Sequence, residues 1–230
     1  MTYHKSGVVA LIPAWNEGKR LEPILTRTMT YLPLLVVDDG SVDDTAAIAE
    51  ACGATVVKHS ENQGKGVALM TGFEWAWEHG YDAVMTLDAD GQHDPADIPA
   101  FMACYTTSNA ELIIGRRDFS KMPFPRLYTN PFGSWLLSKA LAQKIDDNQS
   151  GFRIYRRELL EAVELTTSGF ELEVEVIIKA VVQGMTIDWV DIRTIYGIDK
   201  VSYFHPLHDT AIFLRMVRRA YRYRVEHQEG

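Results

Sequence analysis

The sequence of 230 residues contains little cysteine and no long apolar segment. Its two cysteines, Cys52 and Cys104, fall in segments whose pattern predicts helix, and they form neither a disulfide framework nor a cysteine-based metal site. The apolar run at residues 8–13, "VVALIP", is too short for a signal peptide or a membrane span, and no other window approaches the required length. We therefore expect a protein of the reducing cytoplasm without a transmembrane segment.

The sequence also lacks a basic excess, internal repeats and low-complexity linkers. Its 23 Lys and Arg residues face 31 Asp and Glu residues, which gives a formal charge of −8. Proteins that bind nucleic acid usually carry a basic excess that neutralises phosphates, so we expect no nucleic-acid partner. The hydrophobic share of 47% is sufficient at this length for one well-buried domain.

Short segments rich in β-branched residues alternate with helical patterns in the first half of the chain. These segments are residues 7–12, 33–39, 54–59, 81–88 and 110–117. The alternation predicts an α/β fold with a mostly parallel central sheet and helices on both faces. One helix is expected to have its N-cap at Ser41 and to end at Gly53, and another to begin at Pro95.

The second half has a different pattern. Residues 120–134, "SKMPFPRLYTNPFGS", are rich in Pro, Ser and aromatic residues, which predicts a long loop. After this loop we expect helices near residues 135–142 and 173–183, and strands near residues 152–155 and 186–196.

Polar residues directly follow four of the predicted strands. The stretches are "PAWNE" at 13–17, "DDGS" at 38–41, "DADGQH" at 88–93 and "GRR" at 115–117. In open α/β sheets, ligands bind beyond the carboxyl ends of the strands, so four strands would deliver polar groups to one edge. A solvated loop is the alternative for each stretch alone, but their convergence favours an active site.

The acidic stretch after the fourth strand predicts a cation. Asp88, Asp90 and Gln92 would share one side of an extended segment, where the carboxylates repel each other unless positive charge lies between them. Hard oxygen ligands of this kind suit Mg²⁺ or Mn²⁺. A helix–loop–helix calcium site does not fit, because the glycine is at the fourth position and Pro99 stands where a bidentate Glu is required. His93 is either a further ligand or a hydrogen-bonded loop residue.

The glycine-rich stretch "NQGKGVALMTG" at 62–72 has neither the spacing of a Walker phosphate loop nor that of a dinucleotide fingerprint. Gly64, Lys65 and Gly66 can still bring backbone N–H groups and one ammonium to a diphosphate at the start of a helix. The alternative is a turn and helix cap without a ligand.

Taken together, "IPAWNE", "VVDDGSVDDT", "NQGKGVALMTG", "DADGQHDP" and "DNQSGFRIYRREL" resemble glycosyltransferase family 2, and within it the dolichyl- and polyprenyl-phosphate hexose synthases, such as dolichol-phosphate mannosyltransferases. The resemblance runs from about Val8 to Asp209. It implies a nucleotide-diphospho-sugar transferase (GT-A) domain at 1–209, with a nucleotide-sugar half (1–117) and an acceptor half (118–209). It also implies inverting, metal-dependent transfer of a hexose from a GDP- or UDP-linked donor to a polyprenyl or dolichyl phosphate.

The resemblance also implies roles for individual residues. The nucleotide-sugar donor would contact Pro13, Asn16, Glu17, Asp38, Asp39, Lys65, Asp88 and Ala89, with Asp39 on the base or ribose. Mg²⁺ or Mn²⁺ would be held by Asp88, Asp90 and Gln92. Phosphate groups of the donor or acceptor would meet Arg116, Arg126 and Arg153, and the acceptor phosphate would also meet Lys200 and Ser202, although Tyr203 stands where many relatives have a basic residue. The catalytic residues would be Asp90, Asp147, Arg153 and Glu175, with Glu173 as the alternative to Glu175. Asp147 and Arg153 either brace the sugar site or form an internal salt bridge.

The nature of the acceptor decides whether a general base is needed. A lipid phosphate, with a second pKa of about 6, is largely dianionic at neutral pH and needs no strong base. A soluble or glycan hydroxyl would need one, and Asp147 or Glu175 would supply it. A non-catalytic nucleotide-sugar-binding paralogue is a further alternative, whereas a nucleotidyltransferase is disfavoured because "LIPAWNEGKR" has no glycine loop.

The last residues, 210–230, predict a basic amphipathic helix. Its apolar positions are Ile212, Phe213, Met216, Val217, Ala220 and Tyr221, and its arginines are Arg215, Arg218, Arg219, Arg222 and Arg224. This helix either packs its apolar stripe on the domain or meets an anionic membrane surface or a membrane-protein partner, and the two are compatible. We expect a peripheral protein at the cytoplasmic membrane face whose liposome binding weakens with salt and with replacement of Arg218, Arg219 and Arg222 by Gln.

Overall fold

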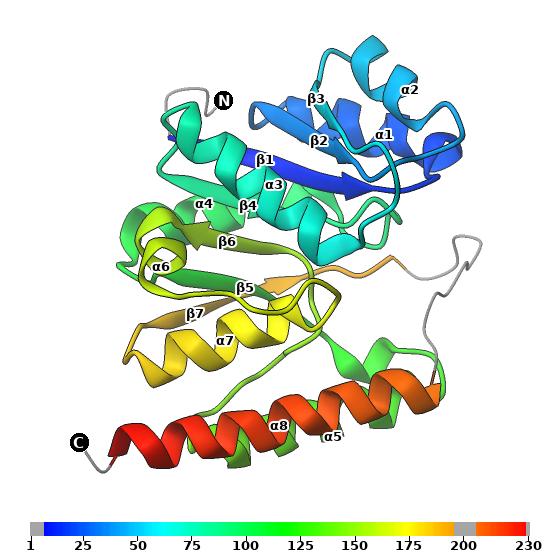
Figure 1. The fold of residues 1–230 in the computed structure, drawn as a ribbon. Helices are drawn as coiled ribbons and strands as arrows, with labels where there is room; N and C mark the ends of the chain where they lie inside the picture. Colours follow the sequence, from blue (N-terminus) through cyan, green and yellow to red (C-terminus); the bar gives the residue numbers. More distant parts are fainter. Residues whose placement is uncertain (1–6, 196–205, 229–230) are drawn as a thin grey trace.

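The computed structural model describes residues 7–195 and 206–228. Its centre is a seven-stranded sheet in the order β3-β2-β1-β4-β6-β5-β7 (Figure 1). The strands are β1 (Val8–Ala14), β2 (Leu34–Asp38), β3 (Thr55–Lys58), β4 (Ala83–Thr86), β5 (Leu112–Arg117), β6 (Arg153–Arg156) and β7 (Ile187–Ile192). Only β6 runs antiparallel to its neighbours, β4 and β5, so the expected mostly parallel sheet is confirmed for the described residues.

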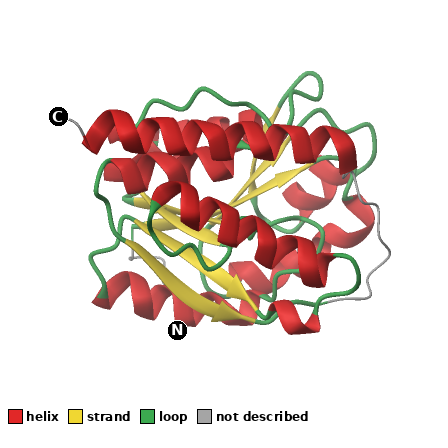
Figure 2. Ribbon diagram, turned by 90° about the horizontal axis from the view of Figure 1, so that it is seen from below, coloured by secondary structure: helices red, strands yellow, loops and turns green. Residues whose placement is uncertain are grey.

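Helices cover both faces of the sheet, as Figure 2 shows. They are α1 (Gly18–Met29), α2 (Thr45–Ala51), α3 (Lys65–Glu78), α4 (Ile98–Thr107), α5 (Arg126–Leu141), α6 (Arg157–Ala162), α7 (Leu172–Val182) and α8 (Pro206–Gln228), with short 3-10 turns η1 (Pro95–Asp97) and η2 (Phe119–Lys121). No helix in the described part of the chain is long and apolar enough to cross a membrane.

Successive side chains of each strand point to opposite faces of the sheet and contribute to two hydrophobic cores. On one face, Leu11, Val37 and Ile114 pack with α3, α5, α7 and α8. On the other face, Ile12, Val36 and Ile113 pack with α1, α2 and α4. Because helices cover both faces of the sheet, only the ends of the strands reach the surface. The loops at those ends can therefore carry polar side chains.

Two predictions of local structure were wrong. Residues 126–134 belong to α5 and not to a long loop, because the helix packs along α8. The packing is close: a Cβ atom added at Gly133 would lie 3.5 Å from the ring of Phe213. The helix after β2 begins at Thr45 and not behind an N-cap at Ser41. The Ser41 hydroxyl instead accepts a hydrogen bond from the backbone N–H of Asn16 at 2.9 Å.

Candidate active site

The carboxyl ends of β1 and β4 lie side by side although β2 and β3 separate them in the sequence. A reversal of strand order of this kind opens a crevice at the end of the sheet. Pro13 is half-buried at the end of β1, Asp38 is buried at the end of β2, and Ala89 is buried just beyond β4. The structure therefore brings these three predicted donor contacts to the same edge.

Hydrogen bonds join the loops after β1 and β2. Asn16 adopts a left-handed backbone with a φ of 56°, and its side-chain oxygen accepts from the N–H of Val42 at 2.9 Å. The N–H of Glu17 donates to the hydroxyl of Thr45 at 2.9 Å. These bonds keep Asn16 and Glu17 at the sheet edge, where the pKa of Glu17 is raised by burial and by the negative charge of Asp90.

Asp39 positions the glycine-rich turn. Its carboxylate accepts from the backbone N–H groups of Gln63 at 2.9 Å and Gly64 at 2.8 Å, and it lies 2.7 Å from His59 Nδ1. The side chain is buried, and both oxygens have partners within the protein. Its contact with a base or ribose stays a prediction, whereas its support of the turn before α3 is visible.

Lys65 joins two acids at the centre of the site. Its ammonium lies 2.6 Å from Asp88 Oδ1 and 3.0 Å from Glu173 Oε2. Burial alone would lower the pKa of Lys65, but the charges of the two acids outweigh it and raise that pKa above its usual range. Burial likewise works to raise the pKa of Asp88, and Lys65 reverses the direction and lowers it. Part of the positive charge that the acidic stretch requires thus comes from the protein itself.

Gly151 explains how closely Asp88 fits. A side chain at this glycine would lie 2.5 Å from Asp88 Oδ2, so only glycine leaves room for the carboxylate. The signature "DNQSGFR" contains this residue, but the sequence does not reveal that it faces Asp88.

Asp90 and Gln92 form the outer part of the acidic stretch. Asp90 accepts from the backbone N–H of Gln92 at 2.9 Å and from its side-chain amide at 2.6 Å. Burial, and then the charge of Asp88, raises the pKa of Asp90. His93 is buried, and burial lowers its pKa, so that its neutral Nδ1 accepts the N–H of Asp88 at 3.2 Å.

A divalent cation fits these donors as a partner shared with substrate. Within residues 7–195 and 206–228, no group of three or more His, Cys, Asp or Glu side chains is arranged to hold a metal ion alone. Mg²⁺ is typically bound through one or two carboxylates together with substrate phosphates, and Asp88 and Asp90 supply that number. The charge of Asp88 contributes to the raised pKa of Asp90, which reflects repulsion between the two carboxylates. A cation bound between them would relieve that repulsion.

Arg117 was not among the predicted site residues. Of the neighbours Arg116 and Arg117, however, it is the one whose charge acts on Asp88. Its positive charge works to lower the pKa of both Asp88 and His93. Its guanidinium donates hydrogen bonds to Asp147 at 2.6 and 2.8 Å. The predicted Arg116 binds Asp191 at 2.7 Å and Asp146 at 2.8 Å. Successive strand residues point to opposite faces of the sheet, so only one of the two arginines faces Asp88.

Arg153 and Glu175 are both held by hydrogen bonds within the protein. Arg153 is fully buried and donates to three backbone carbonyls, those of Ser150, Asn148 and Glu173, so an Asp147–Arg153 salt bridge is a wrong alternative. Glu175 accepts four hydrogen bonds from Thr166 and Thr167 at 2.7 to 3.0 Å, away from Lys65.

The acid of α7 that reaches Lys65 is therefore Glu173, the residue named as the spare. Two positions on a helix are separated by about 200°, so Glu173 and Glu175 point to nearly opposite sides. Glu173 is buried, and its second oxygen, Oε1, has no hydrogen-bond partner in the described part of the chain.

The remaining predicted contacts divide into two groups. Arg126 is half-buried as the first residue of α5. Lys200, Ser202 and Tyr203 lie outside the described residues.

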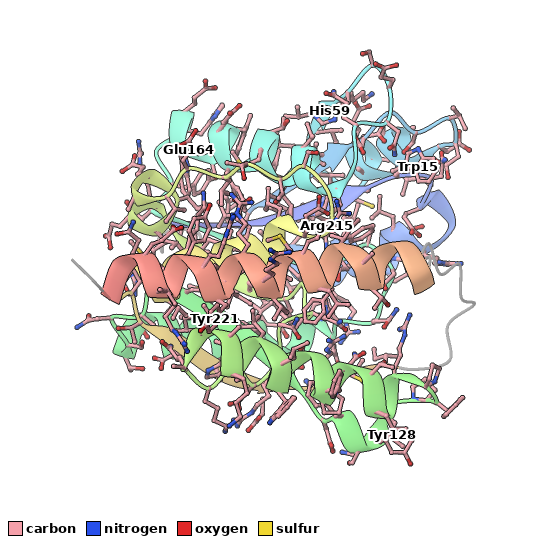
Figure 3. The ribbon with its side chains drawn as sticks, turned by 60° about the horizontal axis from the view of Figure 1, so that its bottom comes forward. Trp15, His59, Tyr128, Glu164, Arg215 and Tyr221 are labelled. Carbon is pink, nitrogen blue, oxygen red and sulfur yellow. The ribbon has the colours of Figure 1, made fainter. Side chains whose placement is uncertain are left out.

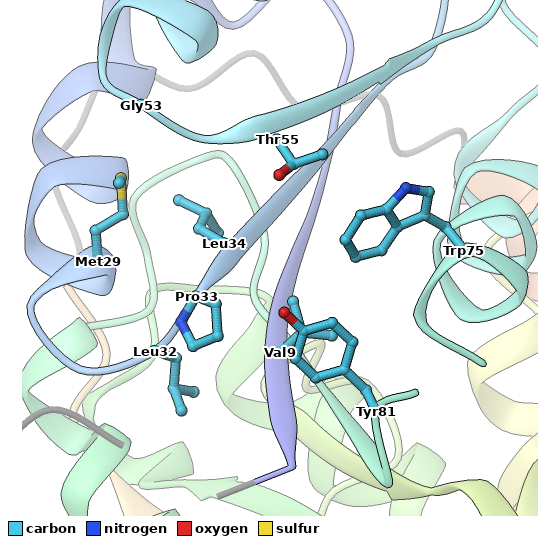
Figure 4. A pocket seen from close by; sticks show the side chains of 9 residues that line it. All are labelled: Val9, Met29, Leu32, Pro33, Leu34, Gly53, Thr55, Trp75 and Tyr81. Carbon is cyan, nitrogen blue, oxygen red and sulfur yellow. The ribbon is translucent and has the colours of Figure 1, made fainter. Parts of the chain in front are cut away.

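A separate pocket of about 270 Å³ lies at the opposite edge of the sheet, at the amino ends of β1, β2 and β3 (Figure 4). Its lining residues are Val9, Met29, Leu32, Pro33, Leu34, Gly53, Thr55, Trp75 and Tyr81. None of them carries a charge, so the pocket offers no counter-charge to a diphosphate.

Comparisons with known proteins agree with this geometry. The model of the glycosyl transferase family 2 matches residues 9–164. The chain is 29% identical over 196 residues to polyprenol monophosphomannose synthase from Mycolicibacterium smegmatis, covering 78% of this chain and 74% of that protein. It is 29% identical over 215 residues to UDP-N-acetylglucosamine-dolichyl-phosphate N-acetylglucosaminyltransferase from Methanococcus voltae, covering 82% and 86%. A crystal structure of glucosyl-3-phosphoglycerate synthase from Mycobacterium tuberculosis with Mg²⁺ and uridine diphosphate superposes with a TM-score of 0.71 at 22% identity, covering 96% of this chain and 84% of that one.

The mostly parallel sheet, the polar switch point and the superposition define a GT-A fold, the fold of nucleotide-sugar-dependent transferases. The chain belongs to glycosyltransferase family 2, and it is a glycosyltransferase.

Proposed function

We propose that this glycosyltransferase moves a hexose, with inversion, from a nucleotide-diphospho-sugar to a polyprenyl or dolichyl phosphate, and that it requires Mg²⁺ or Mn²⁺. The relatives from Mycolicibacterium smegmatis and Methanococcus voltae carry names of enzymes that act on polyprenyl or dolichyl phosphates.

The observation that carries the proposal concerns Asp147 and Glu175, the two carboxylates predicted as bases for a hydroxyl acceptor. Both are already occupied by other contacts within the protein. Asp147 accepts hydrogen bonds from Nε and Nη2 of Arg117 and from the N–H of Gln149. Glu175 is saturated by the N–H and hydroxyl groups of two threonines, which lower its pKa to about 2 against the opposing effect of burial. Glu175, with its lowered pKa, is a poor proton acceptor, and both oxygens of Asp147 already accept hydrogen bonds from Arg117. A phosphate acceptor is already ionised at neutral pH and needs no base.

The donor side uses the acids and Lys65. When bound, a divalent cation would neutralise the charge that develops on the departing nucleoside diphosphate. Asp88 and Asp90 would hold that cation, and Lys65, at the first position of α3, presents an ammonium at the end of the helix where the dipole favours anions. Glu173 holds Lys65 from the other side and so fixes the direction of its ammonium.

The proposal is tested by measuring release of nucleoside diphosphate and formation of a glycolipid from a panel of UDP- and GDP-hexoses. Each donor is incubated with Mn²⁺ or Mg²⁺ and with a polyprenyl phosphate, with 3-phosphoglycerate, or with no acceptor. We expect glycolipid only with metal and polyprenyl phosphate. Product on 3-phosphoglycerate or another hydroxyl acceptor, without glycolipid, would overturn the choice of acceptor, and metal-independent glycolipid formation would overturn the cation.

A further inference from the structure

Three large aromatic side chains project from one side of α5. Tyr128, Phe132 and Trp135 are 66%, 60% and 53% exposed. Their spacing of four and three residues places them on one face of the helix, and the rings of Phe132 and Trp135 stack with centroids 5.8 Å apart. We call these three residues the aromatic face. A contiguous exposed apolar surface of this kind marks a contact with a partner or a membrane.

A basic helix lies beside the aromatic face. Helix α8 runs along α5, with Phe213 against Gly133 and the Arg224 guanidinium 3.3 Å from the carbonyl oxygen of Lys139. Figure 3 shows both helices on the same side of the molecule, with Tyr128 near the start of α5 and Tyr221 beside α8. Leu214 and Tyr221 of α8 are themselves 51% and 53% exposed, so apolar exposure continues from one helix to the other.

The arginines of α8 divide into two sets. Arg219 turns inward, where it lies 3.3 Å from Glu175 and donates to the Thr166 hydroxyl at 2.9 Å. Arg215, Arg218 and Arg222 are exposed, and we call them the basic face. Helix α5 carries two basic residues and no acid, and α8 carries five arginines and two acids, in a chain whose net charge is −8.

We propose that the aromatic face and the basic face together form the surface by which this protein binds an anionic lipid bilayer. Aromatic side chains with a polar edge, such as Tyr128 and Trp135, favour the boundary between headgroups and acyl chains, and arginines favour anionic headgroups. The inference rests on the proposed function, because the acceptor proposed there is a membrane lipid.

The charges argue against a second copy of the chain as the occupant. In a two-fold dimer the same patch meets itself, so the exposed arginines of both copies would be brought into one interface without acids to pair with them on either patch. An anionic bilayer complements that charge.

The arrangement also gives the bilayer access to the active site. Helix α8 begins on the side of the molecule toward which β1 points, and from there it runs back along the domain (Figure 1). A bilayer lying against α5 and α8 would therefore extend to the edge where the strands end, which is the edge that carries Asp88 and Asp90.

The test is sedimentation of the full-length protein with vesicles of phosphatidylcholine alone or mixed with phosphatidylglycerol, at low and high salt. We expect binding to the mixed vesicles at low salt. Tyr128→Ser/Phe132→Ser/Trp135→Ser should weaken the partition coefficient by about tenfold or more. Arg218→Gln/Arg222→Gln should weaken it by about tenfold at low salt and have little effect at high salt.

Two controls make the result specific. Lys58→Gln/Arg157→Gln removes the same number of charges from exposed ion pairs with Glu50 and Glu161 and should leave binding unchanged. Trp135→Phe keeps the ring and should retain binding, but it should lose most of the tryptophan quenching caused by brominated lipids. Thermal melting of every variant reports on folding, which exposed positions should not disturb.

The outcomes separate this inference from the proposed function. Donor hydrolysis, and transfer to a short-chain polyprenyl phosphate in the absence of vesicles, should be unchanged in the aromatic and basic variants; if the wild type shows neither activity, the proposed function fails while the vesicle result still stands. Absence of wild-type binding to anionic vesicles at low salt overturns the inference, as does equal binding of all variants. A wild-type dimer in light scattering that the aromatic substitutions convert to a monomer also overturns it, and identifies a second copy as the occupant.

Discussion

Removing the charge of Lys65 is the sharpest test of how the site is held together. Lys65→Met keeps most of the apolar stem but leaves Asp88 and Glu173 without their shared cation. Loss of one partner of a buried ion pair costs about 3–5 kcal/mol. Because the Asp88 side chain is 28% exposed and water screens it, the lower end applies, so we expect a loss of about 3 kcal/mol in the free energy of unfolding, or on the order of a hundredfold in its equilibrium constant.

The pH dependence follows from the directions of the pKa shifts. In the wild type, the lowered pKa of Asp88 stabilises the fold above the usual range of a carboxyl, and the raised pKa of Lys65 stabilises it below the usual range of an ammonium, so both contributions are present at neutral pH. In the variant, Asp88 loses its counter-charge and its pKa rises. The destabilisation should therefore be largest near pH 7 and should shrink toward about pH 4, where Asp88 becomes protonated.

The assay is urea unfolding of wild type, Lys65→Met and the control Lys58→Met at both pH values. Lys58 forms an exposed ion pair with Glu50 at 2.8 Å, and its loss should cost less than about 1 kcal/mol. Mn²⁺ should raise the melting temperature of Lys65→Met more than that of the wild type, because Asp88 is then free of its ammonium partner. Equal losses in the two variants, or a loss that does not change with pH, would refute the reasoning.

Three further predictions concern single residues. Asp90→Asn should abolish metal-dependent turnover while the melting temperature stays unchanged or rises slightly, since its charge is opposed by burial and by Asp88; wild-type turnover in saturating Mn²⁺ would contradict its metal role. Glu175→Gln should lower the free energy of unfolding by about 2 kcal/mol or more at neutral pH. That loss should fade as the pH falls from about 4.3, the usual pKa of Glu, toward the native value of about 2, and a pH-independent loss would show that the charge is not responsible. Arg126→Ala should weaken the use of polyprenyl phosphate more than donor hydrolysis, with poor rescue by Lys because the planar fork is lost; equal losses in both assays would assign Arg126 to the donor side.

The sheet and its active edge were predictable because their signals are local. Runs of β-branched residues mark each strand, and polar residues directly follow the strands, so the parallel arrangement alone brings Pro13, Asp38 and Asp88 together. The resemblance to glycosyltransferase family 2 was confirmed by the match over residues 9–164.

Orientation and long-range packing were not predictable in this way. Glu175 and Arg116 stay predicted site residues, but Glu173 is the acid of α7 that pairs with Lys65, and Arg117 is the arginine whose charge acts on Asp88. Which residue turns toward these groups depends on the rotation of a helix and on the face of a strand. Those angles are set by packing against α8 and by the pairing of Arg117 with Asp147 across 30 residues, and neither is written in a local pattern. The first half of α5 was missed for the same reason, because the proline-rich residues 120–134 favour a loop and contacts with α8 override that preference.

The contacts of Glu175 make α8 part of the same cooperative unit as the start of α3. Arg219 of α8 and the N–H groups of Thr166 and Thr167 share the Glu175 carboxylate. The next carbonyl, that of Ser168, accepts the N–H of Val67 at 3.2 Å and leaves no room for a side chain at Gly66. Detachment of α8 would remove a counter-charge from a buried acid and loosen the loop that seals the first turn of α3. In native-state hydrogen exchange, the amides of Thr166, Thr167 and Val67 should accordingly lose protection together with those of α8, as one sub-global opening rather than as the fraying of a chain end.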